Sequence, residues 1–313
     1  MFQQKSFSKA KGIRMLRGLL SLLLGCALGL SATFTLGSRE SAAATRPNTL
    51  VAEVPLKFNG PMPVVEVIIN GKGPFQFGID TGGEGQARVD SALVESLGLP
   101  KVGQVMAADG MGRNSRALDT VKIESLNLGD AQFKNVVAAT RNYNENPRMP
   151  HVDGYLGFNL FVDYLLTLDY PAGRVRLERG ELAQPDGANI LSYQAAHGSP
   201  SVELSFGELK VSAHMDTGNL VGAVMLPSSV VSKLTLTSEP RVVGRARTAT
   251  SDVEIREVSV KETMRLGRHE FQQPTVAFSD MFHDANIGLR LLKNFALTFD
   301  QKNRRVKFIK QAG

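Results

Sequence analysis

The sequence has very little cysteine: Cys26 is the only one in 313 residues. Because Cys26 lies in an apolar N-terminal stretch, the rest of the chain can form no disulfide and has no thiolate for catalysis or metal binding. The five histidines show no His-Glu-x-x-His spacing, and the chain lacks Gly-x-Ser-x-Gly and Walker A motifs. These absences exclude several enzyme classes, and the sequence implies no metal and no cofactor.

Excess charge is also missing from most of the chain. The formal net charge is +6, but residues 1–44 hold six basic residues and one acidic residue, which leaves 30 basic and 29 acidic residues elsewhere. Arg304, Arg305 and Lys307 form a basic end that is typical of a solvated strand edge. A nearly neutral remainder predicts no nucleic-acid partner.

The N-terminal charge belongs to a targeting pattern. A basic cluster precedes an uncharged run over residues 18–36, as in an export signal. We expect residues 1–44 to be a cleaved signal peptide and the folded part to be periplasmic or associated with the cell envelope. Two alternatives are a membrane tether through residues 18–36 and, less favoured, lipidation at Cys26.

The rest of the chain is an internal duplication. Asp-Thr-Gly occurs at 80–82 and again at 216–218, and each copy follows an alternating segment that predicts a β-hairpin. Gly157 and Asp169 are twelve residues apart, as are Gly288 and Asp300. This repeated spacing predicts two equivalent lobes.

Turn-forming residues at 179–189 predict the linker between these lobes, which we place at residues 50–180 and 190–313. Each lobe has the pattern of short strands, with brief helices expected near residues 90–97 and 227–234. The predicted fold class is therefore all-β, with two pseudo-symmetric lobes.

The paired tripeptides also predict chemistry. Hydrolysis of a peptide bond without a metal or a covalent intermediate needs one group that takes a proton from water and another that donates one. Two carboxylates about 4 Å apart repel by about 4 kcal/mol at an effective dielectric constant near 20, so such a pair retains one proton. Asp80 and Asp216 are the candidate catalytic pair, and their apparent pKa values belong to the pair.

The other tripeptide residues have supporting roles in this hypothesis. Gly82 and Gly218 permit tight loops whose backbone N–H groups hydrogen-bond the carboxylates. Thr81 and Thr217 supply hydroxyls that can bond the backbone of the opposite loop.

This pattern resembles the pepsin and retropepsin superfamily, and most closely the bacterial retropepsin-like aspartyl proteases. The resemblance covers residues 50–310 and implies two β-barrel lobes with a cleft between them for an extended peptide. In that family an apolar residue and a glycine support each loop, and the matching pairs are Leu156-Gly157 and Ile287-Gly288. The family's flap implies a mobile hairpin tip at Asp109, Gly110, Met111 and Gly112, with a second near residues 244–251.

Several residues depart from the family pattern. Gly83 and Asn219 follow the tripeptides where Ala or Ser is common, and Asn286 precedes Ile287-Gly288. His214 lies two residues before Asp216 on the same strand face, where it either alters the protonation of the pair or simply packs.

Alternative readings remain for the tripeptides. A single Asp-Thr-Gly is adequately explained as a strand-ending turn, but two copies at equivalent repeat positions favour function. The main interpretation is an aspartic endopeptidase that acts on a peptide or protein substrate. The alternative is a peptide-binding module that keeps the fold without cleaving. Since one chain carries both aspartates, we expect a monomeric catalytic unit.

Overall fold

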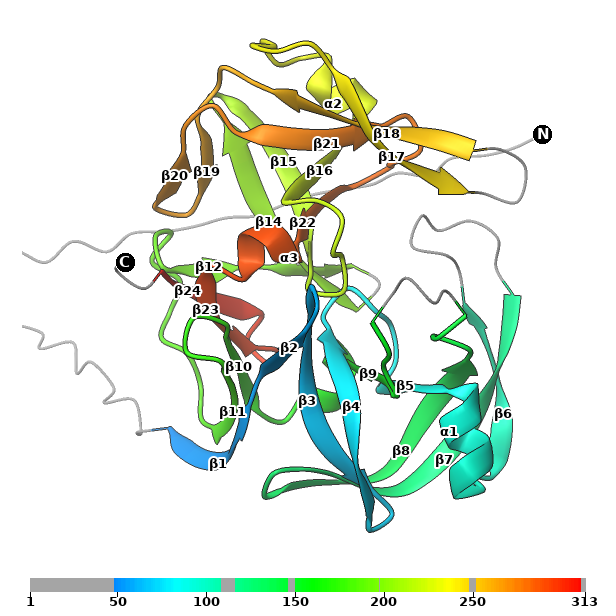
Figure 1. The fold of residues 1–313 in the computed structure, drawn as a ribbon. Coiled ribbons are helices and arrows are strands. Elements are labelled where there is room, and N and C mark those ends of the chain that lie inside the picture. Colours follow the sequence, from blue (N-terminus) through cyan, green and yellow to red (C-terminus); the bar gives the residue numbers. More distant parts are fainter. Residues whose placement is uncertain (1–47, 108–115, 146–149, 197, 248–251, 311–313) are drawn as a thin grey trace, which may run out of the picture. The chain divides into compact units, whose positions relative to one another are not determined.

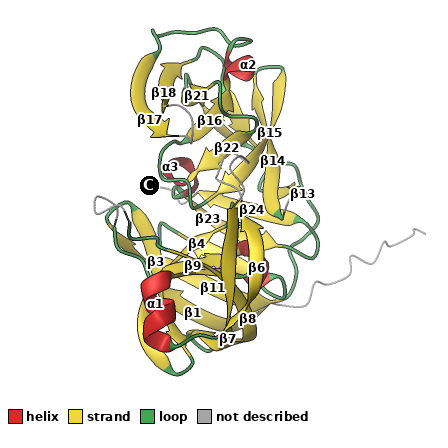
Figure 2. Cartoon of the chain, turned by 90° about the vertical axis from the view of Figure 1, so that its right-hand side faces the viewer, coloured by secondary structure: helices red, strands yellow, loops and turns green. Residues whose placement is uncertain are grey.

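The computed structural model describes residues 48–107, 116–145, 150–196, 198–247 and 252–310. Strands dominate these residues, and the helices are short (Figure 2). The helices are α1 (Ser91–Leu97), η1 (Phe158–Phe161), α2 (Ser228–Val231) and α3 (Leu289–Leu292). None of the helices in the described ranges has the length and apolar character needed to span a membrane.

The first lobe is built on an eight-stranded sheet (Figure 1). Its order is β2-β3-β4-β9-β5-β8-β7-β6. The strands are β2 (Lys57–Asn59), β3 (Met62–Ile69), β4 (Lys72–Asp80), β5 (Ala87–Asp90), β6 (Lys101–Ala107), β7 (Arg116–Leu128), β8 (Ala131–Arg141) and β9 (Gly154–Gly157). Asn70 and Gly71 join β3 to β4 with φ of 50° and 77°, values that suit the two-residue turns of twisted hairpins.

The second lobe repeats this arrangement. Its main sheet has the order β17-β18-β21-β16-β22-β15-β14-β19-β20, and β13 also pairs with β14. The strands are β13 (Gln194–Ala196), β14 (Ser199–Phe206), β15 (Leu209–Asp216), β16 (Val224–Pro227), β17 (Arg241–Arg247), β18 (Asp252–Ser259), β19 (Met264–Leu266), β20 (His269–Phe271), β21 (Thr275–Ser279) and β22 (Ala285–Gly288).

The two sheet orders confirm the predicted all-β, duplicated fold. From the hairpin outward, β3-β4-β9-β5-β8-β7-β6 in the first lobe corresponds strand by strand to β14-β15-β22-β16-β21-β18-β17 in the second. In both lobes a hairpin strand ends in the Asp of the tripeptide and pairs in parallel with a short, later strand. The structure therefore gives each residue of one loop a counterpart in the other.

A third sheet contains strands from both halves, which the sequence reading did not anticipate. Its order is β1-β11-β10-β23-β24-β12. The strands are β1 (Thr49–Pro55), β10 (Leu165–Asp169), β11 (Arg174–Arg179), β12 (Ile190–Ser192), β23 (Phe295–Asp300) and β24 (Arg305–Lys310). Between β11 and β12, residues 180–189 contain no helix or strand.

The centre of this shared sheet is buried. All five residues of β10 are buried, and β10 pairs antiparallel with β23, so that Thr167 lies opposite Thr298. The two threonine hydroxyls are 2.9 Å apart, within hydrogen-bond distance, which satisfies polar groups that would otherwise be costly in the interior. Phe158 and Phe299 pack edge to face nearby, with ring centroids 5.2 Å apart.

The short helices α1, α2 and α3 directly follow the strands β5, β16 and β22. Helix α1 begins after Asp90, whose side chain accepts the N–H of Ala92 at 2.9 Å, and it ends at Gly98 in the left-handed conformation.

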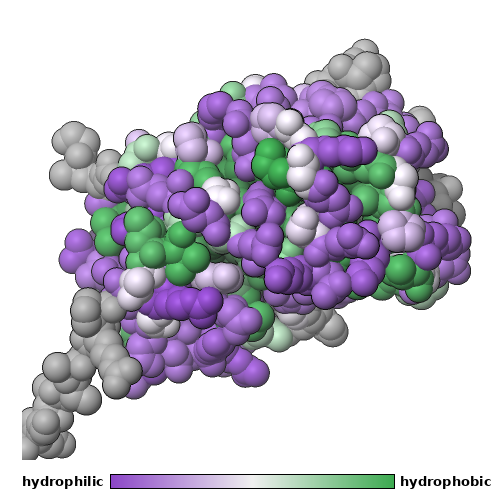
Figure 3. All heavy atoms as spheres, turned by 90° about the horizontal axis from the view of Figure 1, so that it is seen from below, coloured by the Kyte–Doolittle hydropathy of each residue, from purple (hydrophilic) through white to green (hydrophobic). Residues whose placement is uncertain are grey.

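The described surface is mainly hydrophilic on the face shown in Figure 3, where hydrophobic side chains form separate groups between hydrophilic ones. Apolar atoms contribute a large share of the surface of any folded protein.

Candidate active site

The two Asp-Thr-Gly loops meet through a reciprocal set of hydrogen bonds. The hydroxyl of Thr81 donates to the carbonyl of Met215 at 2.6 Å and accepts the N–H of Thr217 at 3.1 Å. The hydroxyl of Thr217 donates to the carbonyl of Ile79 at 2.7 Å and accepts the N–H of Thr81 at 3.0 Å. Both threonines are fully buried or nearly so. Each loop is thus held by the backbone of the other.

The aspartates lie against the opposite glycines. A β-carbon on Gly218 would lie 2.6 Å from Cγ of Asp80, and one on Gly82 would lie 2.5 Å from Oδ1 of Asp216. Both distances are far below van der Waals contact, so only glycine is compatible with this approach. The structure therefore brings Asp80 and Asp216 together across the two loops.

Backbone donors hold the two carboxylates in the same way. The N–H of Gly82 donates to Oδ1 of Asp80 at 2.9 Å, and the N–H of Gly218 donates to Oδ1 of Asp216 at 3.0 Å. Hydrogen bonds of this type fix the carboxylate planes and stabilise negative charge.

The apolar-glycine pairs lie beside the loops. Asp80 pairs with Gly157 on β9, and Asp216 pairs with Gly288 on β22. A β-carbon on Gly157 would overlap the carbonyl oxygen of Gly85, and one on Gly288 would overlap that of Gly222. Leu156 and Ile287 next to them are completely buried. The two strands therefore lie directly against the segments that follow the tripeptides.

The environment of Asp216 favours its protonated form. Burial, followed by the charge of Asp80, raises the pKa of Asp216 to about 6. Hydrogen bonds from Asn286 and Gly218 oppose this rise because they stabilise the anion. A carboxyl with a pKa raised in this way keeps its proton at a pH where an isolated carboxyl has lost it.

Three residues near the pair were noted in the sequence only as departures from the family pattern. The amide of Asn286 donates to Oδ2 of Asp216 at 3.0 Å and accepts from the side chain of Asn219 at 2.8 Å. Gly83 lies next to the guanidinium of Arg88. Arg88 itself, which forms an ion pair with Asp80, was missed by sequence reasoning. The only local signal for it was the unusual glycine at position 83.

His214 does not extend the site through its described contacts. Its Nδ1 lies 2.8 Å from the hydroxyl of Ser201, and its Nε2 lies 3.9 Å from a carboxylate oxygen of Asp284. These contacts join His214 on β15 to Ser201 on β14 and to Asp284 just before β22, and they correspond to the packing alternative for this histidine.

The predicted flap residues Asp109, Gly110, Met111 and Gly112 lie outside the described residues. The strands on either side of them, β6 and β7, pair antiparallel as far as Ala107 and Arg116. In the second lobe β17 and β18 pair as far as Arg247 and Asp252. The flap role stays a prediction.

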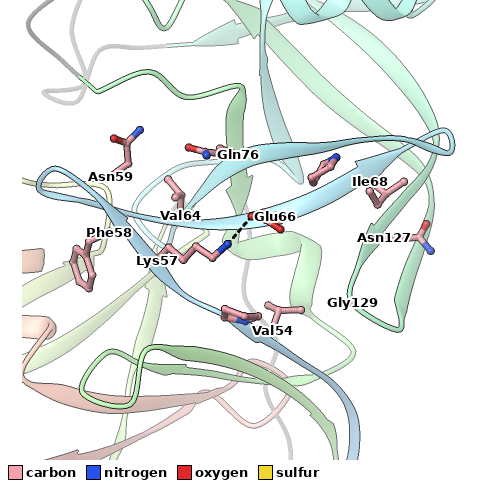
Figure 4. Close-up of a pocket in the computed structure, with 12 residues that line it drawn as sticks. Val54, Lys57, Phe58, Asn59, Val64, Glu66, Ile68, Gln76, Asn127 and Gly129 are labelled. Atoms are coloured by element: carbon pink, nitrogen blue, oxygen red, sulfur yellow. Dashed lines mark hydrogen bonds and ion pairs between the residues drawn. The ribbon is translucent and has the colours of Figure 1, made fainter.

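A pocket on the first lobe does not include the aspartates. It lies beside β2, β3 and β4, and Figure 4 shows Val64 and Gln76 at its wall with the Lys57 and Glu66 ion pair across it. Within the described residues no group of acidic, histidine or cysteine side chains is arranged to hold a metal ion.

The fold and the paired loops together define a duplicated, retropepsin-like aspartic-protease architecture. The aspartyl protease family profile matches the chain twice, at residues 65–160 and 202–291, which together cover more than half of it. The chain therefore belongs to the aspartyl protease family. No curated protein matches the chain.

Proposed function

We propose that this protein is an aspartic endopeptidase in which Asp80 and Asp216 activate a water molecule to hydrolyse a peptide bond. The observation that carries the proposal is the approach of the two carboxylates, each seated against the opposite glycine and held by a backbone N–H. The raised pKa of Asp216 supports a pair that shares one proton. One carboxylate takes a proton from water while the other carboxyl donates one to the substrate carbonyl oxygen.

We further propose the substrate, the catalytic unit and the location of the enzyme. The substrate is an extended peptide or protein segment lying across the two loops, and one chain supplies the complete unit because it contains both aspartates. The N-terminal targeting pattern supports an exported enzyme in the periplasm or cell envelope. No metal or cofactor is needed, since the two carboxyls divide the proton transfers between them.

The test is cleavage of a library of unstructured, internally quenched peptides by the full chain between pH 3 and pH 8. We expect Asp80→Asn and Asp216→Asn each to lower kcat/KM by roughly a thousandfold or more, because each removes one member of the acid and base pair. Asp130→Asn is the matched control, since Asp130 is exposed in the turn between β7 and β8. It should cleave like the wild type.

The alternative function is a peptide-binding module on the same fold. It would be supported if the wild type bound peptides saturably but released no product at any pH in this range. Cleavage that survives in either aspartate variant, with the fold verified by circular dichroism, would refute the proposed pair.

A further inference from the structure

The carboxylate of Asp80 has a cationic partner within its own lobe. Arg88 on β5 donates from Nη2 to Oδ2 of Asp80, and only 21% of the Arg88 side chain and 15% of the Asp80 side chain are exposed. The other oxygen of Asp80 accepts the N–H of Gly82 at 2.9 Å. One oxygen of this carboxylate is therefore bound by a neutral backbone donor and the other by a positive charge.

The second lobe has no such charge at the equivalent place. Arg88 lies opposite Tyr155 in the pairing of β5 with β9, and Met225 lies opposite Asn286 in the pairing of β16 with β22. Met225 is thus the counterpart of Arg88. Oδ2 of Asp216 is instead bound by the neutral amide of Asn286 at 3.0 Å. The backbone donors to the two aspartates are symmetric, whereas the side-chain donors differ by a full charge.

Glycine at position 83 makes the arginine possible. A β-carbon on Gly83 would lie 2.5 Å from Cζ of Arg88 and closer still to both terminal nitrogens. Because the guanidinium occupies the space that a side chain at 83 would need, alanine or serine there would displace it. Gly83 and Arg88 are two parts of one arrangement.

The surroundings keep Arg88 charged and aimed at Asp80. Its guanidinium lies over the ring of Tyr155, with Cζ 5.4 Å from the ring centroid. Burial is the largest effect and opposes the charge of Arg88. The charge and hydrogen bond of Asp80, together with Tyr143 and Tyr155, outweigh it, so the pKa of the guanidinium is raised. Its Nε is buried and has no hydrogen-bond partner among the described residues, whereas its Nη2 donates to Asp80.

The other titratable groups facing this site are tyrosines and more distant arginines. Burial raises the pKa of Tyr143, Tyr155 and Tyr170, and the charge of Asp80 adds to each rise, so all three are neutral from acidic to neutral pH. Arg116 and Arg141 act on Tyr143, and Arg141 also acts on Tyr155. Among the described side chains, Arg88 is the cation that forms an ion pair with one of the two candidate aspartates, Asp80.

We infer that Arg88 is a positioning residue that keeps Asp80 as the anion, so that Asp216 carries the proton of the pair; the catalytic part of this inference rests on the proposed function. Asp80 then takes a proton from water as the water oxygen bonds to the carbonyl carbon, and Asp216 gives its proton to the carbonyl oxygen. Collapse of the resulting diol breaks the C–N bond. The proton on Asp80 passes to the leaving nitrogen, and a diol hydroxyl returns a proton to Asp216.

The test is a pH titration of the two aspartate carboxyl carbons by NMR in full chain labelled with 13C at the aspartate side chains. The Asp→Asn variants assign the signals. Arg88→Met introduces the residue of the equivalent position in the second lobe, and Arg88→Lys keeps the charge as its matched control. We expect Arg88→Met to raise both apparent pKa values of the pair by about one to three units, and Arg88→Lys to raise them much less.

A second, independent variant fills the space that the guanidinium of Arg88 occupies beside Gly83. Gly83→Ala should displace the guanidinium and raise the apparent pKa values as Arg88→Met does. In the double variant the two shifts should not add, because both substitutions remove the same ion pair. If one of these variants folds poorly, the other still tests the ion pair.

The two hypotheses fail in different ways. If Arg88→Met leaves both apparent pKa values unchanged, or if Arg88→Lys moves them equally, the role of Arg88 is refuted whether or not peptides are cleaved. If the carboxyl shifts occur as expected but the wild type cleaves nothing, the endopeptidase proposal fails and the charge asymmetry stands. Where cleavage is measurable, the pH profile of kcat/KM should shift to higher pH in Arg88→Met, by the same amount as the carboxyl titration.

Discussion

Thr81 and Thr217 each accept the other's backbone N–H on a hydroxyl oxygen, at 3.1 Å and 3.0 Å. Each hydroxyl also donates to a carbonyl of the opposite hairpin strand, so four hydrogen bonds cross between the two tripeptide loops. Since the aspartates directly precede these threonines, any movement of one loop relative to the other would also move the carboxylates.

The first prediction concerns this threonine pair. Thr81→Val and Thr217→Val keep the side-chain shape but leave buried backbone groups without partners, so each should lower the free energy of unfolding by about 2–4 kcal/mol. The double variant should lose less than the sum, because the hydroxyls act on the same interface. Urea unfolding followed by circular dichroism measures this loss. Thr237→Val, at an exposed threonine, is the control and should stay within about 0.5 kcal/mol.

The second prediction concerns the glycines beside the loops. Gly157→Ala and Gly288→Ala should each destabilise the protein by more than about 3 kcal/mol, because the new methyl group would overlap a backbone carbonyl that cannot rotate away. Gly244→Ala is the matched control, since a β-carbon there meets nothing within 4 Å. A melting temperature for Gly157→Ala close to that of the control would contradict this steric account.

The duplicated fold could be predicted because its signals are local and occur twice. The tripeptides at 80–82 and 216–218 each follow a segment in which apolar and polar residues alternate, as in a strand. Their glycines suit a close approach of two backbones. The structure brings both tripeptides together at equivalent positions of equivalent sheets. The catalytic roles of their residues stay predictions.

The shared sheet and Arg88 could not be predicted in this way. The pairing of Leu165–Asp169 with Phe295–Asp300 joins segments far apart in the chain, and alternation reveals a strand but not its partner. The approach of Arg88 to Asp80 depends on β5 returning beside β9 after the loop. Glycine at position 83 indicated free space there, but the sequence did not indicate which side chain fills that space.

The third prediction is a pH dependence of stability that originates at Asp216. Since its pKa is raised from 3.8 to about 6 in the folded protein, the folded state binds the proton more tightly than the unfolded state. This stabilisation is fully present below about pH 4 and is lost as the pH rises through about 6, amounting to about 3 kcal/mol. Asp216→Asn should therefore be more stable than the wild type at pH 7 and similar to it at pH 4, as measured by urea unfolding at each pH.

A second aspartate provides the control for that experiment. The hydrogen bond and the charge of Lys302 lower the pKa of Asp163, so its contribution to stability is present above about pH 4 and is lost only on further acidification. Asp163→Asn should consequently leave the change in stability between pH 4 and pH 7 as it is in the wild type. If Asp216→Asn also preserves that change in stability, the raised pKa of Asp216 in the folded protein is refuted.

The fourth prediction concerns the aromatic contact under the shared sheet. Phe299 on β23 is completely buried and packs edge to face on Phe158, which follows β9 in the other half of the chain. Phe299→Ala should cost about 3–5 kcal/mol because it leaves a cavity between segments from both halves, whereas Phe299→Leu should cost less because it fills most of that space. Phe58, with 49% of its surface exposed, gives the control Phe58→Ala, expected to cost less than about 1 kcal/mol. Equal losses for Phe299→Ala and Phe58→Ala would mean that this contact does not contribute to holding the halves together.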